Sequence, residues 1–470
     1  MTMPLPVLLW TDILWFLLLT AVVLFALRAR RHEHLRAPWR RVARNPVAMA
    51  SATVLVVYLL IALLDSLHFH PALENDPNRH SSEILSVLDV ALAGLRQGEK
   101  TFSAPFATHA FAKETLPQPD GTSRRDYPRL LQAGTHLADP VRDRFWDLAL
   151  RASAGFVVGL LVWGLLGGLW LGGRAWWHGE TWWETAVPIL TGRSEIPWRV
   201  IWVTLGILLV LTVTLGFLAP HYHVLGTDKV GEDVLYQSLK SVRTGLVIGT
   251  VTTLVMLPLA LLLGILAGYW GDWVDDVIQY LYTTLNSIPG VLLIAAAVLI
   301  LQGYLNTHAD QFPSLVERAD LRLLFLCLIL GMTSWTGLCR LLRAETLKLR
   351  EMEYVQAAVA LGVRPLPLLL RHILPNVMHI VLITVALDFS GLVLAEAVLS
   401  YVNIGVDPTM QSWGNMINSA RLELAREPVV WWPLSAAFLF MLTLVLTANL
   451  FADGVRDALD PRLRHSREGS

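Results

Sequence analysis

The chain has 470 residues, of which 54% are hydrophobic and only 16% are charged, with a formal net charge of −1. A water-soluble domain carries about a quarter charged residues, so this composition excludes an ordinary soluble protein. Its two cysteines, Cys327 and Cys339, lie about 18 Å apart on one predicted helix, which is too far for a disulfide and excludes a disulfide-stabilised scaffold.

Several apolar runs of 17 to 25 residues have the length needed to cross a hydrocarbon core of roughly 30 Å, and nine spans are counted, which predicts an all-α polytopic membrane protein. The first run lacks a basic start and a small-residue cleavage site, which favours a membrane helix over a signal peptide. In chain order, the predicted transmembrane helices cover residues 8–27, 47–64, 153–172, 199–218, 244–268, 288–305, 323–338, 376–400 and 431–452.

Charge predicts the orientation. Residues 1–64 are predicted to form two transmembrane helices, joined by a loop, 28–46, with seven arginines and one acidic residue. Arginine-rich loops stay in the cytoplasm, so the N-terminus is predicted outside and the C-terminus, nine helices later, inside. The basic loop 339–375 agrees, and so do the arginines of the C-terminal tail, Arg456, Arg462, Arg464 and Arg467.

Residues 65–150 then form a small extracytoplasmic subdomain, in which nine Lys and Arg face twelve Asp and Glu. An apolar stripe predicts an amphipathic helix over Ser81–Leu95, and a second helix is expected over Pro140–Ala152. The intervening residues Phe102–Gly121, rich in Pro, Thr and Gly, are expected to be loop. The pair His68 and His70 is not followed by further ligand spacing, so no metal site is expected.

Residues 151–220 add two helices and a loop that contains Trp176, Trp177, Trp182 and Trp183. Indole rings favour the headgroup layer of a bilayer, so this loop predicts an interfacial helix in contact with membrane lipids.

Residues 221–470 carry the polar positions of greatest interest. Asp228 and Asp233, just before the fifth predicted helix, have the pattern of helix-capping side chains. Asp388 and Glu396 lie inside the eighth predicted helix, where an ionisable group costs about 2.5–3.5 kcal/mol at the helix centre. Two interpretations stay open for these two carboxyl groups: they line a pathway, or they make polar contacts between helices.

The stretch Glu353–Asn376 predicts a short helical hairpin, at residues 350–376, between long apolar segments. Gly362 can take a positive φ and end its first helix, and small side chains let a partner surface approach closely. Arginines there could contact acidic groups of a partner. The residues expected to contact a partner are Tyr354, Gln356, Ala357, Ala358, Leu361, Gly362, Arg364, Arg371 and Pro375.

This hairpin closely resembles the EAA motif of ABC-importer permeases, with Gln356-Ala357-Ala358 where the family usually has Glu-Ala-Ala. From His223 onward the chain is similar to the inner-membrane permeases of oligopeptide and dipeptide importers. The similar blocks, in order, are His223–Leu235, Ala267–Asp275, the hairpin, Glu396–Tyr401, Trp413–Met416 and Asn449–Arg464. In the same comparison Pro38–Met49 resembles the approach to the family's first helix, and residues from about 65 to 198 are an insertion.

The resemblance implies an ABC type I importer permease core over 221–470, in the bacterial inner membrane, that moves a solute and is not itself an enzyme. It implies as partners a second homologous permease, two ABC ATPase subunits and an extracytoplasmic solute-binding protein. No cofactor is expected on this chain, because ATP and Mg²⁺ belong to the ATPase subunits, and no nucleic acid is expected. Asp228, Asp233, Asp388, Glu396 and Trp413 then become possible pathway or gate residues.

Other functions stay open at this point. The chain has no G-x-x-x-x-G-K-[ST] sequence, so ATP hydrolysis would come from another chain. A peptide is the expected cargo, and an ABC importer of another solute is an alternative. An ion-gradient-driven carrier that relays protons through Asp388 and Glu396 is a second alternative, and a membrane enzyme or receptor is a third without a catalytic constellation to support it.

Overall fold

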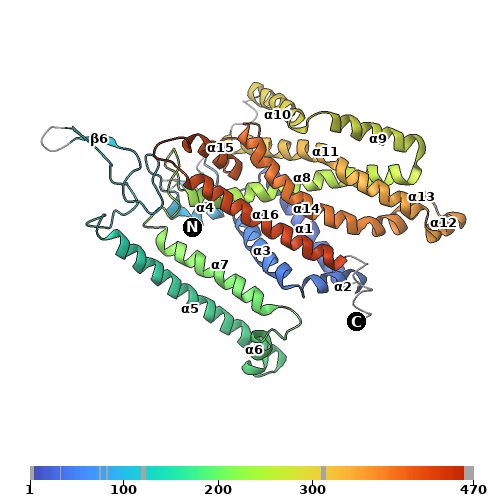
Figure 1. Ribbon diagram of the computed structural model, residues 1–470, viewed down its shortest axis with the longest axis horizontal. Helices are drawn as coiled ribbons and strands as arrows, with labels where there is room; N and C mark the ends of the chain where they lie inside the picture. The colour runs from blue at the N-terminus through green and yellow to red at the C-terminus, as the bar shows by residue number, and fades with distance from the viewer. Residues whose placement is uncertain are drawn as a thin grey trace. The chain divides into compact units, whose positions relative to one another are not determined.

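The computed structural model describes residues 5–31, 33–73, 76–80, 83–117, 123–308 and 314–459. Helices make up most of these residues, and the strands are few and short (Figure 1). Among them, eight helices are long and apolar enough to cross a membrane. A helix pair bent by 84°, Asp272–Ser287 and Gly290–Leu305, adds a ninth if the pair is one span. The predicted all-helical polytopic fold of about nine spans is therefore confirmed.

The helices are α1 (Trp10–Arg30), α2 (Glu33–Val42), α3 (Pro46–Ser66), α4 (Val87–Ala91), η1 (Ala93–Leu95), α5 (Arg144–His178), α6 (Trp182–Leu190), α7 (Trp198–Leu218), α8 (Val234–Trp270), α9 (Asp272–Ser287), α10 (Gly290–Thr307), α11 (Leu315–Arg350), α12 (Glu353–Ala360), α13 (Pro365–Leu368), the π-helical η3 (Leu369–Ile373), α14 (Leu374–Tyr401), α15 (Trp413–Glu423) and α16 (Trp432–Leu459). The strands are β1 (Leu5–Val7), β2 (His68–His70), β3 (Ala72–Leu73), β4 (Asp76–His80), β5 (Leu85–Ser86), β6 (Glu114–Pro117) and β7 (Ser123–Asp126).

Most spanning helices are longer than the apolar runs that predicted them. The third predicted span, 153–172, is part of the 35-residue helix α5, and the helix expected over 140–152 supplies its first turns rather than a separate element. Hydropathy marks only the part of a helix that lies in hydrocarbon. The backbone hydrogen bonds continue beyond that part because nothing in the sequence ends them.

The described chain divides into two compact units. The first contains the described residues of Met1–Val7, Arg40–Thr244 and Gln411–Thr447. In it, β1, β2 and β5 form a three-stranded antiparallel sheet, with Leu5 opposite His70. The β6–β7 hairpin lies partly in the stretch 102–121 that was expected to be loop, so that expectation is wrong for Glu114–Pro117.

The amphipathic helix expected over 81–95 is shorter than predicted. Ser81 and Ser82 lie outside the described residues, and β5 occupies the next positions. The helix α4 starts only after Ser86, whose side chain accepts a hydrogen bond from the backbone N–H of Asp89, while the Asp89 side chain accepts one from the backbone N–H of Ser86. This reciprocal capping box sets the start of the helix.

In the same unit, α5 and α7 lie side by side and are joined through α6 (Figure 1). A Cβ atom at Gly155 would lie 2.8 Å from the Cα of Thr214, and one at Gly159 would lie 2.9 Å from the Cα of Val210. These glycines let the two backbones approach closely, which is how helices pack where no water drives them together. The helix predicted in the tryptophan-rich loop is present as α6, while Trp176 and Trp177 belong to the end of α5.

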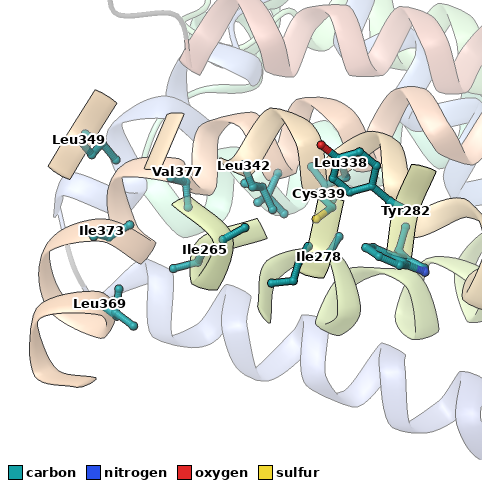
Figure 2. Packing of buried hydrophobic residues seen from close by; sticks show 14 of the residues in the cluster. Ile265, Ile278, Tyr282, Leu338, Cys339, Leu342, Leu349, Leu369, Ile373 and Val377 are labelled. Atoms are coloured by element: carbon teal, nitrogen blue, oxygen red, sulfur yellow. The ribbon is translucent and has the colours of Figure 1, made fainter. Parts of the chain in front are cut away.

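The second unit contains the described residues of Leu8–Trp39, Gly245–Met410 and Ala448–Ser470. Its core is a continuous apolar cluster from α8, α9, α11, α12, η3 and α14. Figure 2 shows part of this packing, with labels on Ile265, Ile278, Tyr282, Leu338, Cys339, Leu342, Leu349, Leu369, Ile373 and Val377. The helix α1 also belongs to this unit, because the backbone N–H and hydroxyl of Thr11 both donate to the buried carboxylate of Asp320 in α11.

Candidate functional site

The hairpin of residues 353–376 starts three residues after α11 ends. Its first helix, α12, ends at Ala360, and Gly362 just beyond it has φ +78°, the positive value predicted for this glycine. The N–H of Gly362 donates to the carbonyl of Val359 at 2.9 Å, and that of Val363 donates to Ala358 at 3.1 Å. Helices commonly end in this way, with one residue in the left-handed conformation and the N–H groups around it donating to the last carbonyl groups of the helix. Arg364 then precedes α13, the second short helix.

One face of this hairpin belongs to the core of the second unit. Val355 and Ala358, three residues apart on α12, are buried in the apolar cluster, and so are Leu368, Leu369 and Ile373. Ala358 was expected to contact a partner, but it packs inside this chain. Its small side chain therefore serves the close contact between α12 and the core, and the surface offered to solvent is made by its neighbours.

The opposite face is exposed and apolar. Leu361 is 85% exposed and Leu366 is 65% exposed, and Ala357, Gly362 and Tyr354 lie on the exposed side with them. Arg364 and Arg371 are exposed at the same hairpin, and neither forms an ion pair within the described residues. A contiguous apolar patch with a charged rim is typical of a protein docking surface. We call it the hairpin surface, made of Tyr354, Ala357, Val359, Leu361, Gly362, Arg364, Leu366, Leu370 and Arg371.

The remaining predicted hairpin residues fix its two ends. The Tyr354 hydroxyl accepts a hydrogen bond from the side-chain amide of Asn376 at 3.1 Å, which ties the start of α12 to the start of α14. Gln356 donates weakly to Glu351 at 3.4 Å. Pro375 lies in the first turn of α14, as expected. Because proline has no N–H to donate to the preceding turn, the chain passes this point through the wider π-helical segment η3.

Two residues that support the hairpin were missed in the sequence. Arg343 of α11 forms two hydrogen bonds to Asp275 of α9, each 2.5 Å long, and Arg350 donates to the carbonyl of Tyr269 at 3.1 Å. A paired, planar arginine–carboxylate contact fixes orientation as well as distance. Asp275 is the last residue of the block Ala267–Asp275, and the resemblance of that block to the family was the available signal that Asp275 matters. Its partner Arg343 lies 68 positions further along the chain, so the contact itself could not be predicted.

The second group of predicted residues lies in the first unit. Asp233 caps α8, since its carboxylate accepts from the N–H groups of Leu235 and Tyr236 at 2.8 and 3.2 Å, which confirms the predicted capping role. Asp228 organises the preceding turn by accepting from the N–H groups of Val230 and Glu232, both at 2.9 Å. Burial raises the pKa of Asp228.

The residues before α8 also bind the segment 65–150 of the same unit, which was predicted to be extracytoplasmic. The ring of His223 lies 2.7 Å from the Asp233 carboxylate and 3.5 Å from that of Glu99. The backbone of Glu99 crosses Gly231 so closely that a Cβ atom there would lie 1.9 Å from the Glu99 carbonyl oxygen. Burial alone would lower the pKa of His223, but the two carboxylates outweigh burial and raise it to about 9.

A second buried ion cluster joins α8 to the same segment. The ammonium group of Lys240 lies 2.8 Å from Asp89 of α4 and 3.3 Å from Asp65 of α3. The Tyr236 hydroxyl donates to Asp89 at 2.7 Å. Burial would raise the pKa of Asp89, but Lys240 and these hydrogen bonds lower it to about 2. Neither the Glu99 contact nor this cluster could be read from the sequence, where the paired residues lie more than 100 positions apart.

The three other predicted pathway residues are Asp388, Glu396 and Trp413, and each has its own surroundings. Asp388 is half-buried in α14, with no hydrogen bond or ion pair within the described residues. Glu396, two turns later on the same helix, is buried and accepts a hydrogen bond from Ser400 at 2.7 Å. Trp413 belongs to the first unit, where its indole N–H donates to the carbonyl of Ser238 at 3.1 Å. No group of three or more His, Cys, Asp or Glu among the described residues is arranged to hold a metal ion.

The structure is thus a multi-pass helical protein with an exposed apolar hairpin between two packed helices, α11 and α14. Residues 260–465 match the family described as "Binding-protein-dependent transport system inner membrane component". The chain belongs to this family, in the group of inner-membrane permeases of peptide ABC importers. It is accordingly a multi-pass inner-membrane protein.

Curated relatives support this assignment. The chain is 32% identical over 247 residues to an oligopeptide transport system permease, OppC, of Mycobacterium tuberculosis, a match that covers 53% of this chain and 78% of the relative. It is 29% identical over 311 residues to a glutathione transport system permease, GsiD, of Pectobacterium atrosepticum, covering 59% and 96%. A dipeptide permease, DppC, of Lactococcus lactis is 29% identical over 240 residues, covering 51% and 64%.

Proposed function

We propose that this chain is the subunit through which an ATP-driven importer moves peptides, and that the hairpin surface receives the motion of an ABC ATPase. The observation that carries the proposal is the division of the hairpin into two faces. Val355 and Ala358 hold one face in the core, while Leu361 and Leu366 leave the other exposed. A partner that pushes on the exposed face moves the core through direct packing, which is what alternating access between two states requires.

We further propose the orientation that the charges predict. Several contacts support it, because each joins segments predicted on the same side of the membrane. The N-terminal strand β1 pairs with β2 in the extracytoplasmic segment. On the other side, Arg44 of the arginine-rich loop lies 3.3 Å from Glu195 in the tryptophan-rich loop, and Arg343 binds Asp275. The arginines of the tail beyond residue 459 lie outside the described residues.

The proposed partners are a second homologous permease, two ABC ATPase subunits that hold ATP and Mg²⁺, and an extracytoplasmic solute-binding protein. The exposed apolar side chains of α9 and α10 support a helical partner in the membrane, since Trp273, Tyr280 and Ile300 are each about three-quarters exposed. Asp228, Asp233 and Trp413 remain proposed gate residues. Asp388, which has no partner within the described residues, is the better candidate than Glu396 for the pathway.

A peptide is proposed as the cargo because the relatives are named oligopeptide, dipeptide and glutathione permeases. Glutathione is itself a peptide, so the three names share one chemical class. In this kind of importer the binding protein also selects the solute, and a cargo assay therefore needs the full set of partners. ATP-dependent uptake of labelled di- to pentapeptides by the reconstituted complex tests this part, and uptake of another solute class alone would contradict it.

The coupling proposal is tested with the double variant Leu361→Ser/Leu366→Ser, purified with its partner subunits and reconstituted in vesicles. We expect ATP-dependent uptake to fall at least tenfold and the ATPase subunits to dissociate, because two apolar anchors are lost. Leu131→Ser, which changes a 56% exposed leucine of the extracytoplasmic segment, is the matched control and should leave both unchanged. Uptake driven by an ion gradient without ATP would instead favour the carrier alternative and contradict the proposal.

A further inference from the structure

The helix α6, between α5 and α7, has an apolar face that its own unit does not cover. Thr185, Ala186 and Ile189 are buried against the unit. Trp183, Val187 and Leu190 follow a helical stripe on the other side and are 67%, 49% and 59% exposed. Trp176 and Trp177, at the end of α5, are 85% and 81% exposed. The helix thus has apolar side chains on both faces, which is typical of a helix that is also covered on its outer side.

Arginines surround this apolar face. Arg193 and Arg199 are exposed and form no ion pair within the described residues. Arg40 and Arg44 share a single carboxylate, that of Glu195, at 3.8 and 3.3 Å. Since one carboxylate cannot neutralise four guanidinium groups, a net positive charge remains.

The two other acidic residues of the loop accept hydrogen bonds from neutral groups at the start of α6. The Glu184 carboxylate accepts from the backbone N–H of Thr181 at 2.8 Å, in the capping box of α6. The Glu180 carboxylate accepts from the hydroxyl of Thr185 at 3.1 Å. Because these donors are neutral, both carboxylates keep their charge. Together with Glu195 they carry three negative charges against the four positive charges of the arginines, so a net positive charge remains.

We propose that this surface lies in the headgroup layer of the membrane and binds anionic phospholipids. We call it the α6 surface, made of Arg40, Arg44, Trp176, Trp177, Trp183, Val187, Leu190, Arg193 and Arg199. Exposed tryptophans that flank an apolar stripe match the boundary between headgroups and acyl chains. Clustered arginines next to them are attracted to anionic headgroups, and the attraction adds up over the residues of the cluster.

The neighbouring helices supply a place for the lipid chain. A groove of about 490 Å³ between α5 and α7 is lined almost entirely by apolar side chains, among them Phe156, Leu160 and Trp163. Trp163 lies eleven residues from Arg174, which is about 16 Å along α5 and about half the hydrocarbon thickness. Arg174 itself lies 5.8 Å from the rings of Trp170 and Trp198. A lipid held at the α6 surface would therefore have its acyl chain beside these two helices and reach the groove.

The test uses the full chain in nanodiscs that contain phosphatidylcholine or a mixture with phosphatidylglycerol, each lipid in a brominated form that quenches tryptophan fluorescence. We expect brominated phosphatidylglycerol to quench more strongly than brominated phosphatidylcholine at equal mole fraction. In Arg193→Gln/Arg199→Gln this preference should fall on the order of tenfold. The triple variant Trp176→Phe/Trp177→Phe/Trp183→Phe identifies the part of the quenching that comes from the α6 surface.

The matched control is Arg124→Gln/Arg125→Gln, which removes two exposed arginines from β7 and should leave the preference unchanged. Equal quenching by the two lipids, unaffected by Arg193→Gln/Arg199→Gln, would overturn the proposal. Stoichiometric co-purification of a protein that the same variant releases would also overturn it, because the surface would then be a protein interface. The measurement involves neither ATP nor cargo, so its outcome is independent of the proposed transport function.

Discussion

At the scale of single residues, the N-terminal end of α8 is held by buried charges that face each other across segments distant in the chain. Lys240 and His223 belong to the part of the chain that resembles the permease family, while Asp89 and Glu99 come from the predicted insertion. Removing one member of a buried pair leaves the other without compensation, which costs more than the pair itself contributes. The predicted insertion is therefore bound to the N-terminal end of α8 by charge compensation as well as by shape.

We predict that Lys240→Met lowers the free energy of unfolding by about 3 kcal/mol, because Asp65 and Asp89 lose their shared cation. Thermal unfolding of the purified protein, followed by tryptophan fluorescence, measures the effect. Adding Asp89→Asn to this variant should recover part of the loss. Lys100→Met is the control, since Lys100 is exposed and 3.8 Å from its partner Glu114, and its effect should stay within about 0.5 kcal/mol. A Lys240→Met protein as stable as the parent would refute the charge-compensation argument.

The stability should also depend on pH through His223. Its pKa is raised from 6.5 to about 9 in the folded protein, so its contribution is complete below about pH 6.5 and is lost as the pH rises through about 9. When it is complete, this contribution to the free energy of unfolding is about 3 kcal/mol. We expect the midpoint of thermal unfolding to fall between pH 6.5 and 9.5, and His223→Gln to flatten this dependence. His109→Gln, a histidine of the same unit, should keep the slope; an equally flat profile there would contradict the assignment to His223.

These residues also show what a single sequence reveals. The cap at Asp233 and the positive φ of Gly362 were predictable because each depends on neighbours within three residues. The partners of Lys240 and His223 were not predictable, because the side chains that neutralise them follow from tertiary packing. For the same reason Ala358 was expected at a partner surface, because which side of α12 faces the core depends on its packing against the rest of the unit.

At the scale of elements, the close packing of α8 on α11 positions the hairpin. A Cβ atom at Gly264 would lie 2.8 Å from the carbonyl oxygen of Cys339, and one at Gly268 would lie 2.6 Å from the Cβ of Thr346. Glycines four residues apart let the backbones approach, and α11 then ends just before α12. The apolar runs predicted the existence and the order of these helices. The ends of the helices and the contacts between them depend on close approaches such as those at Gly264 and Gly268, which hydropathy does not reveal.

We predict that Gly268→Leu destabilises the protein by about 1–3 kcal/mol and lowers ATP-dependent uptake, because the added side chain forces α8 and α11 apart. Gly173→Leu makes the same change on α5, where a new Cβ would meet no atom within 4 Å. This control should keep both stability and uptake near the parent values. Thermal unfolding and vesicle uptake, measured side by side, separate the two effects. Equal losses in both variants would show that leucine itself, and not helix packing, is responsible.

At the scale of the whole molecule, the family assignment explains the second half of the chain better than the first. The matched residues 260–465 contain the hairpin and most of the second unit. The first unit contains the predicted insertion, its strands and the α5–α7 helices. Hydropathy was sufficient to predict the apolar helices of both parts. The strands escaped prediction because short polar strands, such as β6 and β7, have no apolar alternation to mark them.

The orientation of the chain is the prediction on which the hairpin, the binding-protein side and the α6 surface all depend. Single cysteines at Leu361 and Leu131, both exposed positions, can be labelled with a membrane-impermeant maleimide. The two native cysteines are fully buried, so they should contribute little background. We expect Leu131→Cys to react in cells whose outer membrane alone is permeable, and Leu361→Cys only in inside-out vesicles.

We expect this result because arginine-rich loops resist translocation. If residues 65–150 are set aside, most arginines of the chain belong to the loops that are joined by the contacts Arg44–Glu195 and Arg343–Asp275. An impermeant reagent reports the side directly, whatever the conformation of the transporter. If Leu361→Cys reacted from outside, the hairpin could not meet a cytoplasmic ATPase, and the coupling proposal would fail along with the orientation. Reaction of both cysteines from one side would point instead to an even number of spans between them, which the bent pair α9–α10 would supply by not crossing the membrane.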